Sequence, residues 1–120
     1  MMHDMSITEN YSIFLDHPLC LDGAKMAQGG MPFAFDEEAG SRYGIMPRHG
    51  TTAEDAKWFD LPSHMVFHTV NAWEEGHEVV LWGCRMPKIE LQPPADKEIQ
   101  VTSKLTEFRF NMKTGCVISP

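Results

Sequence analysis

The sequence predicts an all-β protein, and three observations lead to that class. The 120 residues fall into short segments rich in β-branched and aromatic residues, which is the composition of strands. Turn signals containing glycine and proline separate these segments at close spacing. No window keeps a helical period long enough to compete, whereas residues 105–111 alternate between apolar and polar. The predicted fold is therefore built of sheets.

The first half of the chain is expected to form four strands and one short helical turn. Glu9 and Asn10 separate the first two strands as the polar turn of a hairpin. Prolines close the later strands, because a proline cannot donate a backbone hydrogen bond to a sheet. A glycine-rich loop between the second and third strands leaves room for a helical turn. The strands are expected at residues 5–8, 11–15, 41–46 and 57–60, and the helical turn at residues 24–28.

A second hairpin is expected to open the second half of the chain. Its strands are the apolar stretch at residues 65–73 and the run 78–85, with Gly76 in the turn between them. The charged segment 87–103 contains two adjacent prolines and is expected to be a long surface connection. Residues 105–111 form the final strand.

An internal repeat relates the two halves of the chain. His3 is followed six residues later by Glu9 and an apolar strand, and His68 is followed six residues later by Glu74 and an apolar strand. The copies lie 65 residues apart, which is acceptable for a four-stranded propeller blade with two long loops. Two blades cannot close a ring, because each blade buries its faces only against neighbours. The expected boundaries are residues 1–62 for the first blade and 63–115 for the second.

The charge and the cysteine pattern argue against several classes of partner and site. Seventeen acidic against ten basic residues give a formal net charge of −7, which repels phosphate backbones, so nucleic acid is not an expected partner. Cys20, Cys84 and Cys116 are widely spaced, which favours neither a disulfide framework nor a zinc site. No transmembrane segment is expected, because no apolar run approaches the roughly 20 residues that span a bilayer.

Histidines carry the chemistry that this sequence offers, and there are six of them. His17, His49 and His77 lie at turn signals and are expected to be solvated loop residues. His64 lies four residues before His68, but that spacing on a strand is about 13 Å, which is too far for one metal ion. An exposed position at a strand edge is therefore expected for His64.

His3 and His68 differ from the other histidines because each lies at the start of an apolar strand. One alternative is a buried histidine that bonds a backbone carbonyl. The other follows from the repeat, since equivalent strands of two blades face the same axial point, where two imidazoles could bind iron, copper, zinc or nickel. Glu9 and Glu74 lie about 20 Å further along their strands. We expect these two carboxylates to accept backbone N–H bonds at the hairpin ends.

Four segments together resemble one known family in their order and spacing. They are residues 1–11 (MMHDMSITENY), 41–48 (SRYGIMPR), 57–62 (KWFDLP) and 67–75 (FHTVNAWEE). These segments are similar to motifs of the carotenoid cleavage dioxygenases, a family that includes the retinoid isomerases and the 9-cis-epoxycarotenoid dioxygenases. The resemblance covers residues 1 to about 115.

The resemblance implies about two blades of an incomplete seven-bladed β-propeller, with a non-haem Fe(II) on its axis held by four histidines. His3 matches the second of these ligands and His68 the third, while the other two lie outside this chain. The implied reaction uses O2 to cleave a double bond of a carotenoid or apocarotenoid into two carbonyl products. Phe67 and Trp73 are candidates to line the substrate tunnel. The 120-residue chain alone is expected to be inactive.

Two other functions stay open at this point. One is a non-catalytic β-propeller module that binds a partner and has lost the metal. The other is a retinoid isomerohydrolase-type member of the same family. The plant-like sequence of residues 71–74 (NAWE) argues against this alternative. The implied location is the plastid or the cytoplasm, and the full-length protein is expected to associate with a membrane surface.

Overall fold

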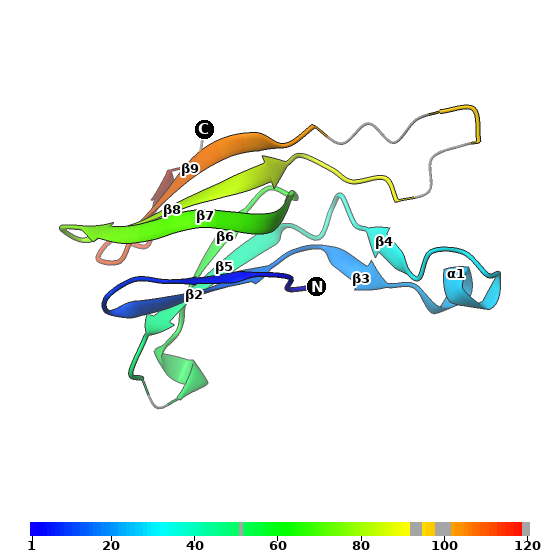
Figure 1. The fold of residues 1–120 in the computed structure, drawn as a ribbon. Coiled ribbons are helices and arrows are strands. Elements are labelled where there is room, and N and C mark those ends of the chain that lie inside the picture. The colour runs from blue at the N-terminus through cyan, green and yellow to red at the C-terminus, as the bar shows by residue number, and fades with distance from the viewer. Residues whose placement is uncertain (51, 92–94, 98–101, 119–120) are drawn as a thin grey trace.

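The computed structural model describes residues 1–50, 52–91, 95–97 and 102–118. Its strands form two four-stranded antiparallel sheets and one two-stranded sheet. The first sheet has the strand order β1-β2-β5-β6, and the second has the order β10-β9-β8-β7. Figure 1 shows the two larger sheets stacked on one another, with β2 and β5 in one layer and β7, β8 and β9 in the other. The predicted all-β class is confirmed.

The first sheet joins a hairpin to two strands that follow a long insertion. Each expected strand is found to within one residue, because β-branched and aromatic residues between turn signals mark these strands locally. A short 3-10 helix, η1 (Ala53–Asp55), precedes the last strand. The strands are β1 (Met5–Ile7), β2 (Tyr11–Asp16), β5 (Ser41–Pro47) and β6 (Lys57–Leu61).

The second sheet begins with the second expected hairpin. Gly76 has a φ of 59° in its turn, a left-handed conformation that glycine adopts without steric cost. The described parts of the connection at residues 87–103 contain no strand or helix, while Pro93 and Pro94 lie outside the described residues. The strands are β7 (Met65–Glu75), β8 (Glu78–Met86), β9 (Lys104–Asn111) and the unexpected β10 (Val117–Ile118).

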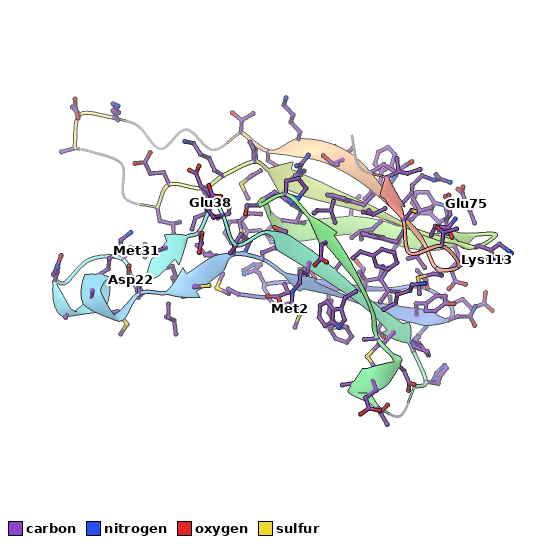
Figure 2. The ribbon with its side chains drawn as sticks, turned by 180° about the vertical axis from the view of Figure 1, so that it is seen from behind. Met2, Asp22, Met31, Glu38, Glu75 and Lys113 are labelled. Carbon is purple, nitrogen blue, oxygen red and sulfur yellow. The ribbon has the colours of Figure 1, made fainter. Side chains whose placement is uncertain are left out.

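An arm extends from the first sheet between β2 and β5. It consists of β3 (Leu19–Leu21), α1 (Gly23–Ala27) and β4 (Phe33–Phe35). The helical turn was expected, but the two paired strands were not, since the glycines and the proline of this segment predict a loop. Figure 2 shows Asp22 and Met31 on this arm at one end of the molecule, with Glu75 and Lys113 at the other end.

The core lies between the two larger sheets. Because side chains alternate along a strand, each sheet turns one apolar face toward the other. Aromatic rings fill the centre, where the ring of Tyr43 lies 5.2 Å from that of Phe108 and 5.1 Å from that of Phe110. The buried members are Ile13, Leu15, Tyr43, Ile45, Phe59, Leu61, Val66, Val79, Leu81, Phe108 and Phe110.

Large apolar side chains are also exposed on strands of both sheets. Met5 and Trp58 lie in one register row of the first sheet, on the face away from the core. Val70 on β7 and Leu105 on β9 are exposed in the second sheet. Exposed apolar surface of this kind is typical of a sheet that packs against further sheets.

The edge strands β1 and β7 belong to different sheets and lie against one another. This contact brings the starts of the two repeat copies together. The division of the chain into blades at residues 1–62 and 63–115 stays a prediction. Within the part of the chain that the structure describes, no helix has the length and apolar character to cross a membrane.

Candidate metal centre

His3 and His68 meet where β1 and β7 lie together. His3 stands two residues before β1, and His68 is the fourth residue of β7. Their ring centroids are 5.2 Å apart, and the ring planes are nearly perpendicular at 89°. Both side chains are exposed. The structure therefore brings together the two histidines that the repeat singled out, although they are 65 positions apart in the sequence.

The separation of the two rings fits two ligands of one ion. With a metal–nitrogen distance of about 2.1 Å and an angle of about 90–109° at the ion, two imidazole centroids would lie about 4.6–5.3 Å apart. The observed separation of 5.2 Å falls in this range. Neutral imidazole is also a good ligand for iron. In residues 1–50, 52–91, 95–97 and 102–118, however, no group of three or more His, Cys, Asp or Glu side chains could hold a metal ion.

Phe67 forms an apolar wall beside His3. Its ring meets the His3 ring edge-on, with centroids 5.4 Å apart and planes at 83°. Phe67 is half-buried against a small apolar cluster that includes Met65 and Met86. Trp73 lies further along β7, and its ring N–H donates to Glu75 at 2.7 Å. Of the two candidate tunnel residues, only Phe67 contacts one of the paired histidines.

A carboxylate links the residues that follow the two histidines. Oδ2 of Asp4 accepts the backbone N–H and the hydroxyl of Thr69, both at 2.8 Å. Oδ1 of Asp4 accepts the backbone N–H of Met5 at 2.8 Å. The backbone bond from Thr69 is the main cause that lowers the pKa of Asp4 below its ordinary value. Asp4 therefore holds β1 against β7 as an anion.

A second carboxylate links the same strands at their other end. Glu74 on β7 accepts the backbone N–H of Asn10 at 2.8 Å, together with the side chains of Asn10 and Thr8. Partial burial acts to raise the pKa of Glu74, but the bonds from Thr8 and Asn10 outweigh it and lower the pKa. The prediction that Glu74 accepts a backbone N–H is confirmed, with the difference that the N–H belongs to the hairpin of the other sheet. Glu9 is exposed.

The prediction that His64 is an exposed strand-edge residue is wrong. His64 directly precedes β7 and is fully buried. Its Nδ1 lies 2.7 Å from the carbonyl oxygen of Pro62, and its Nε2 lies 2.7 Å from the hydroxyl of Tyr43. Burial lowers the pKa of His64 to about 4. Both ring nitrogens have partners in the core, which is why the imidazole can leave the solvent.

The prediction that His17 is a solvated loop residue is also wrong, whereas His49 and His77 are exposed as expected. His17 follows β2 and packs between Tyr43 and His64, with ring centroids 5.4 Å and 5.2 Å away. Burial, followed by the charge of His64, lowers its pKa to about 3. The turn at Pro18 is therefore buried, which the local sequence does not reveal.

The contact between Asp4 and Thr69 was not predicted, although the repeat contains a weak signal for it. Asp4 directly follows His3, and Thr69 directly follows His68, so the two residues occupy equivalent positions of the repeat. Equivalent positions of the two repeat copies can bond one another where β1 and β7 lie together. No comparable sequence signal marks the contact between Tyr43 and His64.

Comparisons of sequence find relatives over almost the whole chain. The family model described as "Retinal pigment epithelial membrane protein" matches residues 1–119. The carotenoid 9,10(9',10')-cleavage dioxygenase of Crocus sativus is 47% identical over 96% of this chain and 22% of its own length. The zeaxanthin 7,8(7',8')-cleavage dioxygenase of Crocus sativus, whose name places it in the chromoplast, is 40% identical over 97% of this chain and 31% of its own length. The chain thus spans less than a third of these relatives.

Comparisons of structure give the same result for the fold. A lignostilbene dioxygenase of Pseudomonas brassicacearum superposes with a TM-score of 0.80 and 26% identity, over 99% of this chain and 26% of its own. The cobalt-substituted ACO of Synechocystis superposes with a TM-score of 0.82 and 23% identity, over 100% of this chain and 26% of its own, and shows likeness of fold. With the family model matched over almost its whole length, the chain belongs to the family of the retinal pigment epithelial membrane protein and the carotenoid cleavage dioxygenases.

Proposed function

We propose that this chain is part of a non-haem Fe(II) dioxygenase that cleaves one double bond of a carotenoid or apocarotenoid. His3 and His68 supply two of its four imidazole ligands, and the other two come from other segments of a longer protein. The observation that carries the proposal is the approach of the two histidine rings to 5.2 Å from strands of different sheets. Membership of the family supports the choice of metal and substrate class.

The roles of the chain's own residues follow from this placement. When bound, the iron supplies activation of O2, whose two oxygen atoms end in the two carbonyl products formed from one carbon–carbon double bond. His3 and His68 hold the ion as neutral imidazoles and leave other positions accessible. Phe67 lies edge-on to His3 and offers the apolar polyene a surface that cannot compete as a ligand. Binding of the polyene along such surfaces would determine which double bond reacts.

Substitution of the two histidines tests this function in the full-length protein. His3→Ala and His68→Ala should each abolish the formation of apocarotenals from a carotenoid, measured by chromatography. His77→Ala is the matched control, because His77 is exposed in the β7–β8 turn and should leave product formation unchanged. Normal product formation by either His3→Ala or His68→Ala would contradict the ligand assignment.

The same assay separates the two alternative functions. A non-catalytic module would form no product even as the unaltered full-length protein. An isomerohydrolase would convert a retinoid substrate without consuming O2 and without cleaving the polyene. Under isotopically labelled O2, we expect label in both carbonyl products. Turnover that leaves the carbon skeleton intact would identify the isomerohydrolase instead.

The arm is our candidate for contact with a membrane surface, where an apolar polyene would be dissolved. Leu21 on β3, Met26 on α1 and Met31 before β4 are all exposed. We propose that these side chains enter the membrane interface while the sheets stay in water. Leu21→Asp and Met26→Asp should reduce co-sedimentation of the full-length protein with phospholipid vesicles. Thr114→Asp, in an exposed turn outside the arm, is the control, and an equal loss in that variant would contradict the proposal.

The location of the protein is a further part of the proposal. We place it in the plastid or the cytoplasm, because the name of one Crocus sativus relative includes the chromoplast. Imaging of the full-length protein fused to a fluorescent protein checks this placement, and secretion from the cell would contradict it.

A further inference from the structure

We propose that Asp4 is a positioning residue of the candidate metal centre, whose carboxylate fixes the separation of His3 and His68 by binding Thr69. This inference rests on the proposed function, because it takes the two imidazoles as ligands of one ion. Asp4 need not touch the metal or the substrate. Its action is to hold the backbone of one ligand at a set distance from the backbone of the other.

Side chains carry the connection between the two ligand-bearing strands. β1 and β7 are edge strands of separate sheets, and the hydrogen-bonded strand order of neither sheet joins them. A backbone ladder would fix the distance between two strands at about 4.8 Å, but here no ladder does so. The distance between His3 and His68 therefore depends on side-chain bonds that cross from β1 to β7.

The bonds from Asp4 to Thr69 are the crossing bonds that lie beside the histidines. Asp4 follows His3 and Thr69 follows His68, so each bonded residue is one Cα step of about 3.8 Å from a ligand. Both donors of Thr69 bind the same carboxylate oxygen at 2.8 Å. Hydrogen bonds to a charged carboxylate are about twice as strong as neutral ones. Two such bonds next to the ligands restrict the distance between His3 and His68.

The local irregularity of β7 makes Thr69 available for this contact. The register of β7 against β8 shifts on both sides of Thr69, which is the pattern of a β-bulge. The backbone N–H of Thr69 donates to Asp4 in the other sheet. Bulges change the direction in which a residue points, and this one directs both donors of Thr69 toward β1.

The chain offers a matched control at the other end of the same two strands. Glu74 bonds Asn10 and Thr8 from β7, as Asp4 bonds Thr69 from β1. Six residues of strand separate Glu74 from His68, which is about 20 Å. Loss of either carboxylate weakens the contact between the sheets, but only the loss of Asp4 acts beside the ligands. Variants of Asp4 and Glu74 therefore distinguish an effect on the position of the two histidines from an effect on the stability of the sheet contact.

The test measures binding of Co(II) by the metal-free full-length protein, together with the visible absorption of the bound Co(II). We expect Asp4→Ala to weaken Co(II) binding by about 10-fold or more and to alter the absorption, since loss of groups that orient ligands costs about 10- to 100-fold in metal affinity. Glu74→Gln should change the affinity less than about 2-fold. An unchanged affinity in Asp4→Ala, or an equal loss in Glu74→Gln, would overturn the proposal.

A pair of substitutions at Thr69 keeps the proposal testable if Asp4→Ala does not fold. Thr69→Ser retains both donors and should bind Co(II) as the unaltered protein does. Thr69→Val has nearly the same shape but lacks the hydroxyl, so it should bind several-fold more weakly. Equal affinities of the two variants would count against Asp4 as a positioning residue.

His3→Ala and His68→Ala distinguish a failure of this inference from a failure of the proposed function. If both variants bind Co(II) as tightly as the unaltered protein, the ligand assignment fails and the positioning role fails with it. If both variants lose Co(II) while Asp4→Ala and Thr69→Val keep it, the proposed function stands and the positioning role alone is overturned.

Discussion

The hydroxyl of Tyr43 lies 2.7 Å from Nε2 of His64 in the buried layer between the two sheets. On the other side of the ring, Nδ1 of His64 lies 2.7 Å from the carbonyl oxygen of Pro62. A carbonyl oxygen can only accept, so Nδ1 carries the proton and Nε2 of the neutral ring accepts from Tyr43. These two bonds fix the chain between β6 and β7, and they bear on the stability of the whole protein.

Tyr43→Phe should destabilise the protein. The substitution removes only the hydroxyl, which leaves the buried Nε2 of His64 without its donor. An unsatisfied buried group costs about 1–3 kcal/mol, and we expect a loss of that size in the free energy of unfolding. Urea denaturation of the full-length protein measures it. Tyr11→Phe, at a half-buried position, is the control, and an equal loss in both variants would contradict the prediction.

His17→Leu should stabilise the protein. His17 is only 3% exposed, and neither of its ring nitrogens has a hydrogen-bond partner among the described residues. A leucine fills a similar volume without polar atoms, so we expect a gain of about 1 kcal/mol in the free energy of unfolding. His17→Gln keeps polar atoms in the same place and should be less stable than His17→Leu. The prediction is wrong if His17→Gln is the more stable variant in urea.

Stability should fall as the pH is lowered from about 6.5 toward about 4. Burial lowers the pKa of His17 to about 3 and that of His64 to about 4, from an ordinary 6.5. Asp16 opposes this effect at His17, and Arg85 adds to it at His64. Below pH 6.5 the unfolded chain therefore binds protons that the folded chain does not, which favours unfolding. Near pH 4 the folded state also takes up a proton at His64, so the loss caused by His64 levels off there, while the loss caused by His17 continues to about pH 3.

The size of this effect allows a direct check. Each buried histidine should contribute about 1.4 kcal/mol per pH unit within that range. Urea denaturation of the full-length protein at about pH 7.5, 6 and 5 gives the slope. His17→Leu removes one of the two groups and should make the slope shallower by about 1.4 kcal/mol per unit. An unchanged slope in His17→Leu would show that His17 does not titrate in this way.

The 120-residue chain alone should not retain stoichiometric iron. The proposed ligands His3 and His68 are only two, and the described residues contain no cluster of three that could hold an ion. Two imidazoles without further donors bind weakly, so Fe(II) added to the isolated chain should be lost on desalting. Elemental analysis checks the result, with the full-length protein as the positive control. About one iron per isolated chain would refute the prediction.

The strands of both larger sheets could be predicted from the sequence because their signals are local. The alternation in residues 105–111 and the apolar runs around Gly76 reflect which face of a strand is buried, and each signal lies within one strand. The short strands β3 and β4 escaped prediction because Pro18 and the glycines at positions 23, 29 and 30 mark that segment as a loop. β10 has only two residues, which is too short for a strand pattern.

The burial of His17 and His64 escaped prediction for a different reason. Both residues stand at turn signals, and turns are usually exposed. In this fold the ring of His64 lies between the two sheets, where it bonds Tyr43 and stacks on Phe108, and His17 packs beside it. Whether a turn faces water depends on how two sheets stack, which no short window of sequence records.

The sequence by itself determined the class of fold, the two hairpins and the equivalent places of His3 and His68 in the repeat, because strand composition and an internal repeat are properties of the order of residues. Only the tertiary structure decided that the two rings lie 5.2 Å apart and that the residue after each histidine, Asp4 or Thr69, bonds the other. Residues 65 positions apart meet only after both sheets have formed and stacked. The distance between them is then set by the packing of the core and by side-chain bonds between strands, neither of which has a local signature in the sequence.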